Sequence, residues 1–420
     1  MKPVFCLMIF IVNVITGYCQ DCNSLAKLKP SVLVRGQDHY QTAVSDSKKP
    51  AGWDISKMKL QLGKAESWIK KTLTGFTGAQ LHYSNDYFLD HVNGGNNSTM
   101  FYKATGLKAF YYGKMRFFQY YCHDNNNKIL TEGESGSFVN VIFNNVFASD
   151  LCSEVGVYTI NGKLTFKIFE KVRSEGRIDF YERRAKSTIY DTIYTSKHDF
   201  IIIRNSDKPV FIPITRKEYL DQLLKDLEKY ESDQKDFLKT NYQRQIKSFE
   251  EEIRVYKEKD KSYTSEKEAK RRKFFAEDVN EEKLNKAVKK IEDDVAASAK
   301  IIKQYLNKPD EWLSSCFRSF YAYSSFTANG LTQYFDKLDI YNESADDLSR
   351  TMVVSLNPSY YNISSGNDQP QLILVHVQKK TYPHMLKVVT LLNKPNAFKD
   401  LEAILISGKS SVAAVTPGIR

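Results

Sequence analysis

The chain has 420 residues, of which 42% are hydrophobic, and a formal net charge of +11. This length is ample for a sizeable core and predicts two or three domains. No segment after the N-terminus has the ~20 continuous apolar residues of a membrane helix, which excludes a membrane-spanning mature chain. The positive charge favours contact with anionic surfaces or polymers, although it also serves solubility without any partner.

The N-terminus has the layout of a secretory signal peptide. A lysine precedes the apolar run VFCLMIFIVNVI, which is too short to cross a bilayer, and Gly17 and Cys19 are small residues at the positions that a signal peptidase reads. We therefore expect residues 1–19 to be removed before Gln20, giving a secreted or periplasmic protein. A lipoprotein is the alternative, but Tyr18 is bulkier than the usual lipidation motif allows before the cysteine.

Residues 20–214 predict a helix followed by an antiparallel β-meander. Apolar residues recur at helical spacing between residues 55 and 73, with Asp54 as N-cap and Gly75 as terminator. Aromatic and β-branched runs follow, which is typical of strands. The pair Asn161-Gly162 predicts a tight hairpin, because both residues tolerate a positive φ, and NSDKP at residues 205–209 predicts a second turn. The strand-like runs are LKAFYYGKMRFFQYYC, SFVNVIFNNVFA, VGVYTINGKLTFKIFEKV, RIDFYERR, TIYDTIYT and DFIIIR.

Residues 215–307 predict a long helical hairpin. Thr215 and Glu218 form a capping box, and Ser265 with Glu268 offers a second one. Between the capping boxes and beyond them, apolar residues alternate in steps of three and four, the pattern of a coiled-coil seam. The polar stretch EKDKSYTSEKEAKRRK, which has no seam pattern, separates the two seamed helices. The seam residues are Leu220, Leu223, Leu227, Tyr230, Tyr242, Ile246, Phe249, Ile253 and Tyr256 in the first helix, and Leu284, Val288, Ile291, Val295, Ser298, Ile302 and Tyr305 in the second.

Strand-like runs resume in residues 308–420, namely FRSFYAYSSF, TMVVSL, QLILVHVQ and AILIS, with a short helix at YPHMLKVVTLLN. An antiparallel hairpin leaves and returns at one place, so it can be inserted between two halves of a sheet without disturbing their pairing. The predicted fold class is therefore α+β: an antiparallel β-rich body in two sequence segments, with an inserted antiparallel coiled-coil hairpin that projects from it.

Two stretches, FIPITRKEYL at residues 211–220 and LNPSYYN at residues 356–362, resemble uncharacterised secreted proteins of Bacteroidetes-type bacteria. The resemblance implies a location in the periplasm or at the cell exterior. It implies no activity and no catalytic residues.

Four cysteines remain after residue 19: Cys22, Cys122, Cys152 and Cys316. Secretion makes disulfides feasible, and the four allow three fully paired arrangements. None forms a C-x-x-C motif, which argues against a zinc site. We expect Cys122 and Cys152 to be unlinked. If the strands that end near them pair as antiparallel neighbours, Cys152 lies roughly 50 Å from Cys122 along the sheet.

Catalytic motifs are weak. Ser135 in GESGS is similar to a hydrolase nucleophile, but the fifth residue is Ser where the G-x-S-x-G elbow has Gly, and a polar hairpin loop explains the run as well. His82, Asp86, Asp90 and His91 could supply a hydrolase or a metal site, yet their spacing fits neither H-E-x-x-H nor a calcium loop. No phosphate-binding glycine loop is present, so no cofactor is predicted. His376, which alternates with apolar residues, is expected to be a hydrogen-bonded histidine within a sheet.

One basic and aromatic cluster is the candidate contact surface. It comprises Lys270, Arg271, Arg272, Lys273, Phe274 and Phe275, near the far end of the predicted hairpin. Such a cluster fits contact with a protein partner or an anionic envelope surface. The alternative is that the basic side chains are only solvated and both rings pack into the seam, in which case no partner is needed. Nucleic acid is not expected for an exported protein. The leading hypothesis is thus a non-enzymatic binding or scaffolding protein that uses the hairpin; the alternative is a secreted hydrolase using Ser135 or the His82–His91 cluster.

Overall fold

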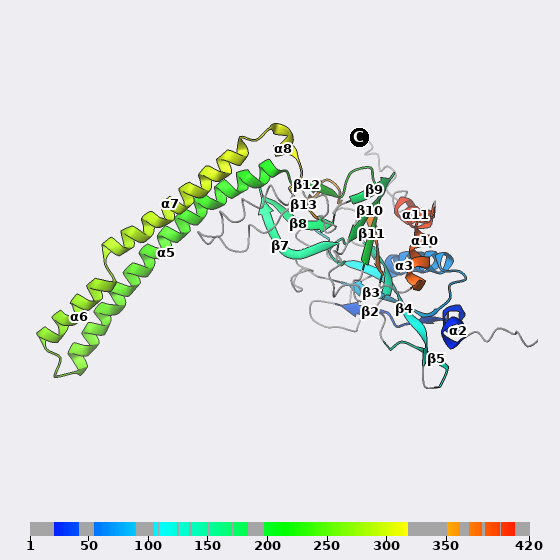
Figure 1. The fold of residues 1–420 in the computed structure, drawn as a ribbon, viewed down its shortest axis with the longest axis horizontal. Coiled ribbons are helices and arrows are strands. Elements are labelled where there is room, and N and C mark those ends of the chain that lie inside the picture. Colours follow the sequence, from blue (N-terminus) through cyan, green and yellow to red (C-terminus); the bar gives the residue numbers. More distant parts are fainter. Residues whose placement is uncertain are drawn as a thin grey trace, which may run out of the picture.

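The computed structural model describes residues 21–41, 54–89, 105–107, 109–123, 126–133, 137–149, 151–169, 171–183, 197–317, 351–361, 369–379, 383–394 and 396–407. Over these residues the protein is an α+β fold with two sheets and a helical projection (Figure 1). The expected leader, residues 1–19, lies outside the described residues. Within them, no helix combines the length and the apolar character that crossing a membrane requires.

The larger sheet combines strands from both ends of the chain. Its order is β1-β3-β4-β6-β14-β11-β10-β9, with β2 also paired to β3 and β5 to β4. β1 and β2 run parallel to β3, and the other pairs are antiparallel. The predicted simple meander is therefore wrong, because the C-terminal strand β14 separates β6 from β11. The strands are β1 (Leu33–Arg35), β2 (His39–Gln41), β3 (Ala79–Phe88), β4 (Phe110–His123), β5 (Lys128–Thr131), β6 (Ser137–Phe143), β9 (Lys171–Glu175), β10 (Ile178–Arg183), β11 (Lys197–Arg204) and β14 (Leu372–Lys379).

Helices α3 (Ser56–Thr72), α10 (Pro383–Leu392) and α11 (Lys399–Ser407) supply residues to the core on one face of this sheet. The predicted helices at residues 55–73 and 382–393 are confirmed, the second over Pro383–Leu392. Gly75 follows α3 with φ +74°, as expected of a terminator. The N-cap is Ile55 instead of Asp54, although the Asp54 carboxylate accepts a hydrogen bond from the Ser56 amide at 2.9 Å.

The run AILIS is helical, which contradicts the predicted strand. It forms the end of α11, where Leu401, Ile404 and Leu405 are buried. Their spacing of three and four residues places them on one side of a helix facing the core. A short apolar run fits either structure when it is read alone.

The smaller sheet has four strands in the order β12-β13-β8-β7 and packs against the second face of the larger sheet. Asn161 and Gly162 join β7 to β8 with φ of 49° and 74°, which confirms the predicted hairpin turn. Phe166 and Val354 of the smaller sheet share a buried cluster with Phe200 of the larger sheet. The strands are β7 (Cys152–Ile160), β8 (Lys163–Phe169), β12 (Phe211–Pro213) and β13 (Thr351–Leu356).

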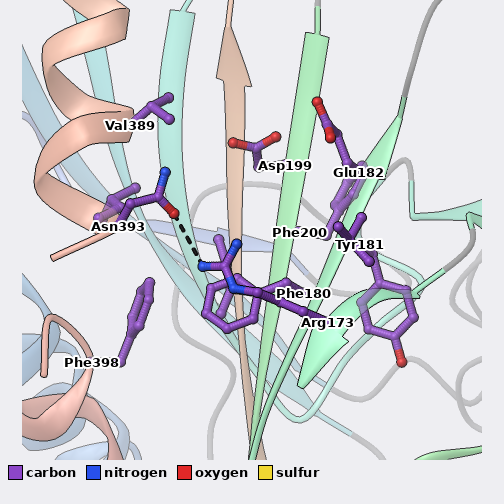
Figure 2. A pocket seen from close by; sticks show the side chains of 12 residues that line it. Arg173, Phe180, Tyr181, Glu182, Asp199, Phe200, Val389, Asn393 and Phe398 are labelled. Atoms are coloured by element: carbon purple, nitrogen blue, oxygen red, sulfur yellow. Dashed lines mark hydrogen bonds between the residues drawn. The ribbon is translucent and has the colours of Figure 1, made fainter. Parts of the chain in front are cut away.

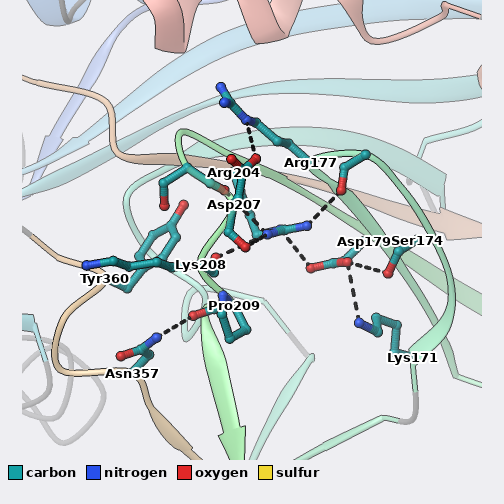
Figure 3. Close-up of polar contacts among 12 residues, drawn as sticks. Lys171, Ser174, Arg177, Asp179, Arg204, Asp207, Lys208, Pro209, Asn357 and Tyr360 are labelled. Atoms are coloured by element: carbon teal, nitrogen blue, oxygen red, sulfur yellow. Dashed lines mark hydrogen bonds and ion pairs between the residues drawn. The ribbon is translucent and has the colours of Figure 1, made fainter.

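The predicted turn at residues 205–209 leads from the larger sheet into the smaller one and is held by a buried arginine (Figure 3). Arg204 donates hydrogen bonds of 2.9 to 3.3 Å to the carbonyl oxygens of residues 206–208, and one of 2.8 Å to the carbonyl of Gly176. Its Nε lies 3.0 Å from the buried Asp179 carboxylate. This ion pair thus ties the turn to β10.

The helical projection follows β12 and consists of α5 (Arg216–Lys259), α6 (Ser265–Asp278) and α7 (Glu281–Leu306). We call residues 216–306 the arm. In Figure 1, α5 runs away from the body, and α6 and α7 return beside it. The predicted capping box is present, with Thr215 accepting from the Glu218 amide at 3.1 Å and Glu218 accepting from the Thr215 amide at 2.9 Å.

The polar stretch expected to connect two helices is itself mostly helical. The chain turns between α5 and α6, and α6 forms the first part of the returning limb. The second capping box is wrong by one residue: Thr264 is the N-cap and accepts a hydrogen bond from the Lys267 amide at 3.3 Å.

The base of the arm is part of the protein core. Leu220, Leu223 and Ile302 are buried together with Ile160 and Val353 of the smaller sheet. The Arg216 amide donates to the Ser315 carbonyl at 3.0 Å, next to the short helix α8 (Asp310–Ser314), so the chain enters and leaves the arm at one place. The first turns of the arm therefore fill an apolar cluster that they share with the smaller sheet.

A disulfide joins Cys22 of helix α2 (Cys22–Leu28) to Cys122 of β4, with Cα atoms 5.5 Å apart. Cys152 is a buried thiol on β7. Cys122 and Cys152 are therefore not linked, as predicted. The register that led to this prediction is also present, since Phe117 of β4 lies opposite Ser137 of β6.

Candidate functional site

The candidate contact surface lies on α6, in the part of the arm farthest from the body (Figure 1). The structure divides the six predicted residues into two groups of three. One group holds α6 against α5, and the other faces solvent.

Both arginines of the cluster bind carboxylates of α5. Arg272 lies 2.5 Å from Glu250 of α5 and 2.9 Å from Glu268 of its own helix. Arg271 lies 3.0 Å from Glu252, and its guanidinium stacks over the Tyr256 ring at 4.0 Å. These contacts orient α6 on α5, so the two arginines have a structural role.

Phe275 also faces α5. Its ring stacks on Phe249 with centroids 4.0 Å apart and an interplanar angle of 6°. Phe249 is buried. The interpretation that both rings pack into the seam is therefore right for Phe275 alone, because Phe274 is 58% exposed.

The second group consists of Lys270, Lys273 and Phe274, which we call the arm-end patch. All three are exposed, and neither lysine forms an ion pair with another residue in the part of the chain that the structure describes. Positions separated by three and four residues lie on one face of a helix, so the three side chains form one continuous surface.

Exposed phenylalanine is a property of the arm. Among the described residues, the phenylalanines on the surface are Phe274 and Phe237, which is 60% exposed on α5. Single exposed apolar residues are common, but an aromatic ring that is more than half exposed on a charged helix buries little of its area against the fold. Sequence patterning did not single out Phe237, although it lies seven residues after Tyr230, because the polar residues Gln234 and Asn241 interrupt the apolar seam on either side of it.

The arm is nearly neutral in charge. Residues 216–306 contain 23 Lys and Arg and 21 Asp and Glu, giving a net charge of +2 out of the +11 of the whole chain. Most of the excess positive charge therefore lies outside the arm. Several arm charges are paired between limbs, for example Lys235 of α5 with Glu292 of α7 at 2.7 Å.

The candidate catalytic residues do not come together in the described structure. Ser135, Asp90 and His91 lie outside the described residues. His82 and Asp86 are on the same face of β3, but four residues in a strand separate them by ~13 Å. The part of the chain that is described contains no group of three or more potential metal ligands.

A pocket of about 270 Å³ lies where β9, β10 and β11 meet α10 and the segment before α11 (Figure 2). Phe180, Leu392 and Phe398 are buried apolar lining residues. The Arg173 guanidinium lies 3.7 Å from the centre of the Phe180 ring and donates to Asn393 at 3.2 Å.

Carboxylates occupy another side of the pocket. Glu182 and Asp199 are direct cross-strand partners on β10 and β11. The lining residues include no serine, cysteine, histidine or lysine, so this pocket offers no hydroxyl- or thiol-based nucleophile of the serine or cysteine hydrolase type. No sequence pattern pointed to it, because its walls come from three segments that are far apart in the chain.

No family model, curated protein or solved structure shows significant similarity to this chain.

Proposed function

We propose that this is an exported, non-enzymatic binding protein whose arm forms an antiparallel coiled-coil hairpin and contacts a protein partner. The observation that carries the proposal is the exposure of Phe274 and Phe237 on a long helical projection whose outer part packs on itself. Aromatic side chains are enriched at protein contact sites, where they often contribute most of the binding free energy.

The length of the arm supports this use. At ~1.5 Å per residue, the 44 residues of α5 extend over about 66 Å. The base fixes the arm to the smaller sheet, and the ion pairs and ring stacking between α5 and α6 keep its far end folded. A rigid projection of this kind presents side chains to a partner without the cost of ordering a loop.

The charges favour a protein over an anionic surface. With a net charge of +2, the arm lacks the basic excess that attraction to anionic lipid or polysaccharide requires. Arg271 and Arg272 are also occupied by carboxylates of the arm itself. Two exposed lysines beside an exposed ring fit a mixed protein surface better.

Export is supported by two features. The N-terminal residues have a signal-peptide pattern, and the Cys22–Cys122 disulfide fits an oxidising compartment. We therefore propose that the protein acts in the periplasm or at the cell exterior, in line with the resemblance of residues 211–220 and 356–362 to secreted proteins.

The experiment is affinity capture from the native envelope with a charge-matched control. The test variant carries Lys270→Ala, Lys273→Ala and Phe274→Ala, and the control carries Lys239→Ala and Lys247→Ala on exposed positions of α5. We expect wild type and control to capture the same partner and the test variant to lose it. Equal capture by all three proteins would contradict the proposal. Co-sedimentation with anionic vesicles that depends on the same patch would assign the surface to lipid instead.

A further inference from the structure

Four polar side chains lie in a row across neighbouring strands, on the face of the larger sheet opposite α3, α10 and α11. Lys114 of β4 lies opposite Asn140 of β6, and Asn140 lies opposite His376 of β14. His198 of β11 joins the row through its Nδ1, which is 2.9 Å from Nε2 of His376. Asn140, His198 and His376 are 7%, 2% and 2% exposed, and Lys114 is half-buried.

Two buried atoms of this row have no hydrogen-bond partner among the described residues. They are Oδ1 of Asn140 and Nδ1 of His376. The expectation that His376 is fully hydrogen-bonded is therefore wrong for one of its ring nitrogens. Leaving a polar atom buried and unpaired costs about 1–3 kcal/mol, and sheets rarely place two beside each other. An oxyanion that accepts from Nδ1 of His376 would remove the cost at that atom, and the Asn140 amide can turn to donate to it or accept from a ligand hydroxyl.

The row also concentrates groups that can carry positive charge. Burial and the nearby Arg116 guanidinium lower the pKa of Lys114. Burial, His198 and Lys114 lower the pKa of His376 well below its usual range. Asp86 is the described carboxylate that interacts with Lys114, and burial raises the pKa of Asp86 itself. Lys114 forms no ion pair within the described residues. A bound anion would therefore offset the repulsion between Lys114 and Arg116.

Aromatic rings border the row. The Lys114 ammonium lies 4.7 Å from the centre of the Phe138 ring. Phe138 contacts the His376 imidazole edge-on with centroids 5.0 Å apart, and Phe200 stacks on it at 4.6 Å. Because these rings exclude water, a hydrogen bond from a cation to an anion is stronger here than at the surface.

We propose that Lys114, Asn140 and His376 bind the oxyanion of a small ligand, either a carboxylate or a phosphate. Lys114 donates from its ammonium group, and His376 donates from Nδ1 while its Nε2 accepts from His198. The Asn140 amide donates to the same oxyanion after rotation about its side-chain torsion, or accepts from an adjacent hydroxyl of the ligand. β6 lies between β4 and β14, so the backbones of Lys114 and His376 are two strand spacings, ~9.6 Å, apart, and the long Lys114 side chain is needed to reach an oxyanion held beside His376 and Asn140.

The test measures binding of inorganic phosphate and of acetate separately, at an ionic strength held constant with sodium chloride. Calorimetry and thermal unfolding report affinity and stabilisation. We expect a saturable rise in Tm with one of the two anions, which identifies the ligand class. Lys114→Met should weaken binding at least tenfold, whereas Lys128→Met, which removes an exposed lysine from β5, should not.

A second variant keeps the test decisive if Lys114→Met fails to fold. Asn140→Asp retains the shape of the side chain but places a carboxylate in the row, so it should abolish anion binding in a protein whose circular dichroism is unchanged. The proposal is overturned if neither anion binds beyond the effect of chloride. It is equally overturned if Asn140→Asp binds the anion as tightly as wild type.

Discussion

Arg204 shows how single side chains connect distant parts of the chain. It binds the turn at residues 206–208, the Gly176 carbonyl and the Asp179 carboxylate (Figure 3). Nearby, the Tyr360 hydroxyl accepts from the Asn205 amide at 3.2 Å, which adds a contact from the C-terminal part of the chain. The turn was predictable from its Asn, Asp and Pro, but the arginine that holds it was not, because its partners are up to 28 residues away in sequence.

Arg204→Met should destabilise the protein by about 3–5 kcal/mol, because it leaves the Asp179 carboxylate buried without its ion-pair partner. Chemical denaturation measures the change. The double variant Arg204→Met with Asp179→Leu removes both charges and should recover part of the loss. A single variant as stable as wild type would show that the ion pair contributes nothing.

His376 should make stability depend on pH. Burial, His198 and Lys114 hold its pKa well below the usual value of about 6.5. Below that pH the unfolded chain takes up a proton that the folded protein does not, so the free energy of unfolding falls as the pH decreases. The limit is about 1.4 kcal/mol per pH unit.

Denaturation between pH 7.5 and 5.5 tests this point, with buffers free of phosphate and carboxylate to keep it separate from ligand binding. His376→Gln should flatten the slope, since the variant cannot titrate there. An unchanged slope would mean that other groups cause the acid sensitivity.

At the level of elements, periodicity predicted most of the structure. The apolar stripe at the base of α5 and α7, the first capping box and the Asn161-Gly162 turn each depend on residues close in sequence, and each is present. Periodicity could not predict the strand order, because β14 lies in the larger sheet between β6 and β11, two strands that precede the arm in the chain. The helix α6 was missed because it has no seam of its own: ion pairs and one aromatic stack hold it instead.

Phe275→Ala should loosen α6. The change removes the stacking on Phe249 and part of its buried area, which we expect to cost about 1–2 kcal/mol locally. Hydrogen exchange should show faster exchange of the α6 amides while the sheets stay protected. Phe274→Ala is the matched control: its ring is 58% exposed, so α6 protection should not change. Equal effects of the two variants would refute the assignment of the two rings.

At the scale of the whole molecule, the arm divides into a base that belongs to the core and an outer part that does not. Replacing residues 236–291 with a short glycine-rich loop keeps Leu220, Leu223 and Ile302 in place. The new ends are close together, because Lys235 and Glu292 are ion-paired at 2.7 Å, so the loop costs little entropy. We expect cooperative unfolding and an intact β signal in circular dichroism.

Removing residues 216–306 entirely should behave differently. It exposes Ile160 and Val353 of the smaller sheet together with the rest of the shared cluster, so we expect a marked loss of stability or aggregation. If the shorter deletion also abolished cooperative unfolding, the outer arm would be part of the core.

The most direct test of the proposed function is photo-crosslinking in the native envelope. A photoreactive phenylalanine analogue replaces Phe274 in one protein and Lys239, also exposed on the arm, in another. We predict one discrete protein adduct from position 274 and a weak or absent adduct from position 239. Adducts only with lipid, equal adducts from both positions, or none at all from position 274 would contradict the claim that the end of the arm binds a protein partner.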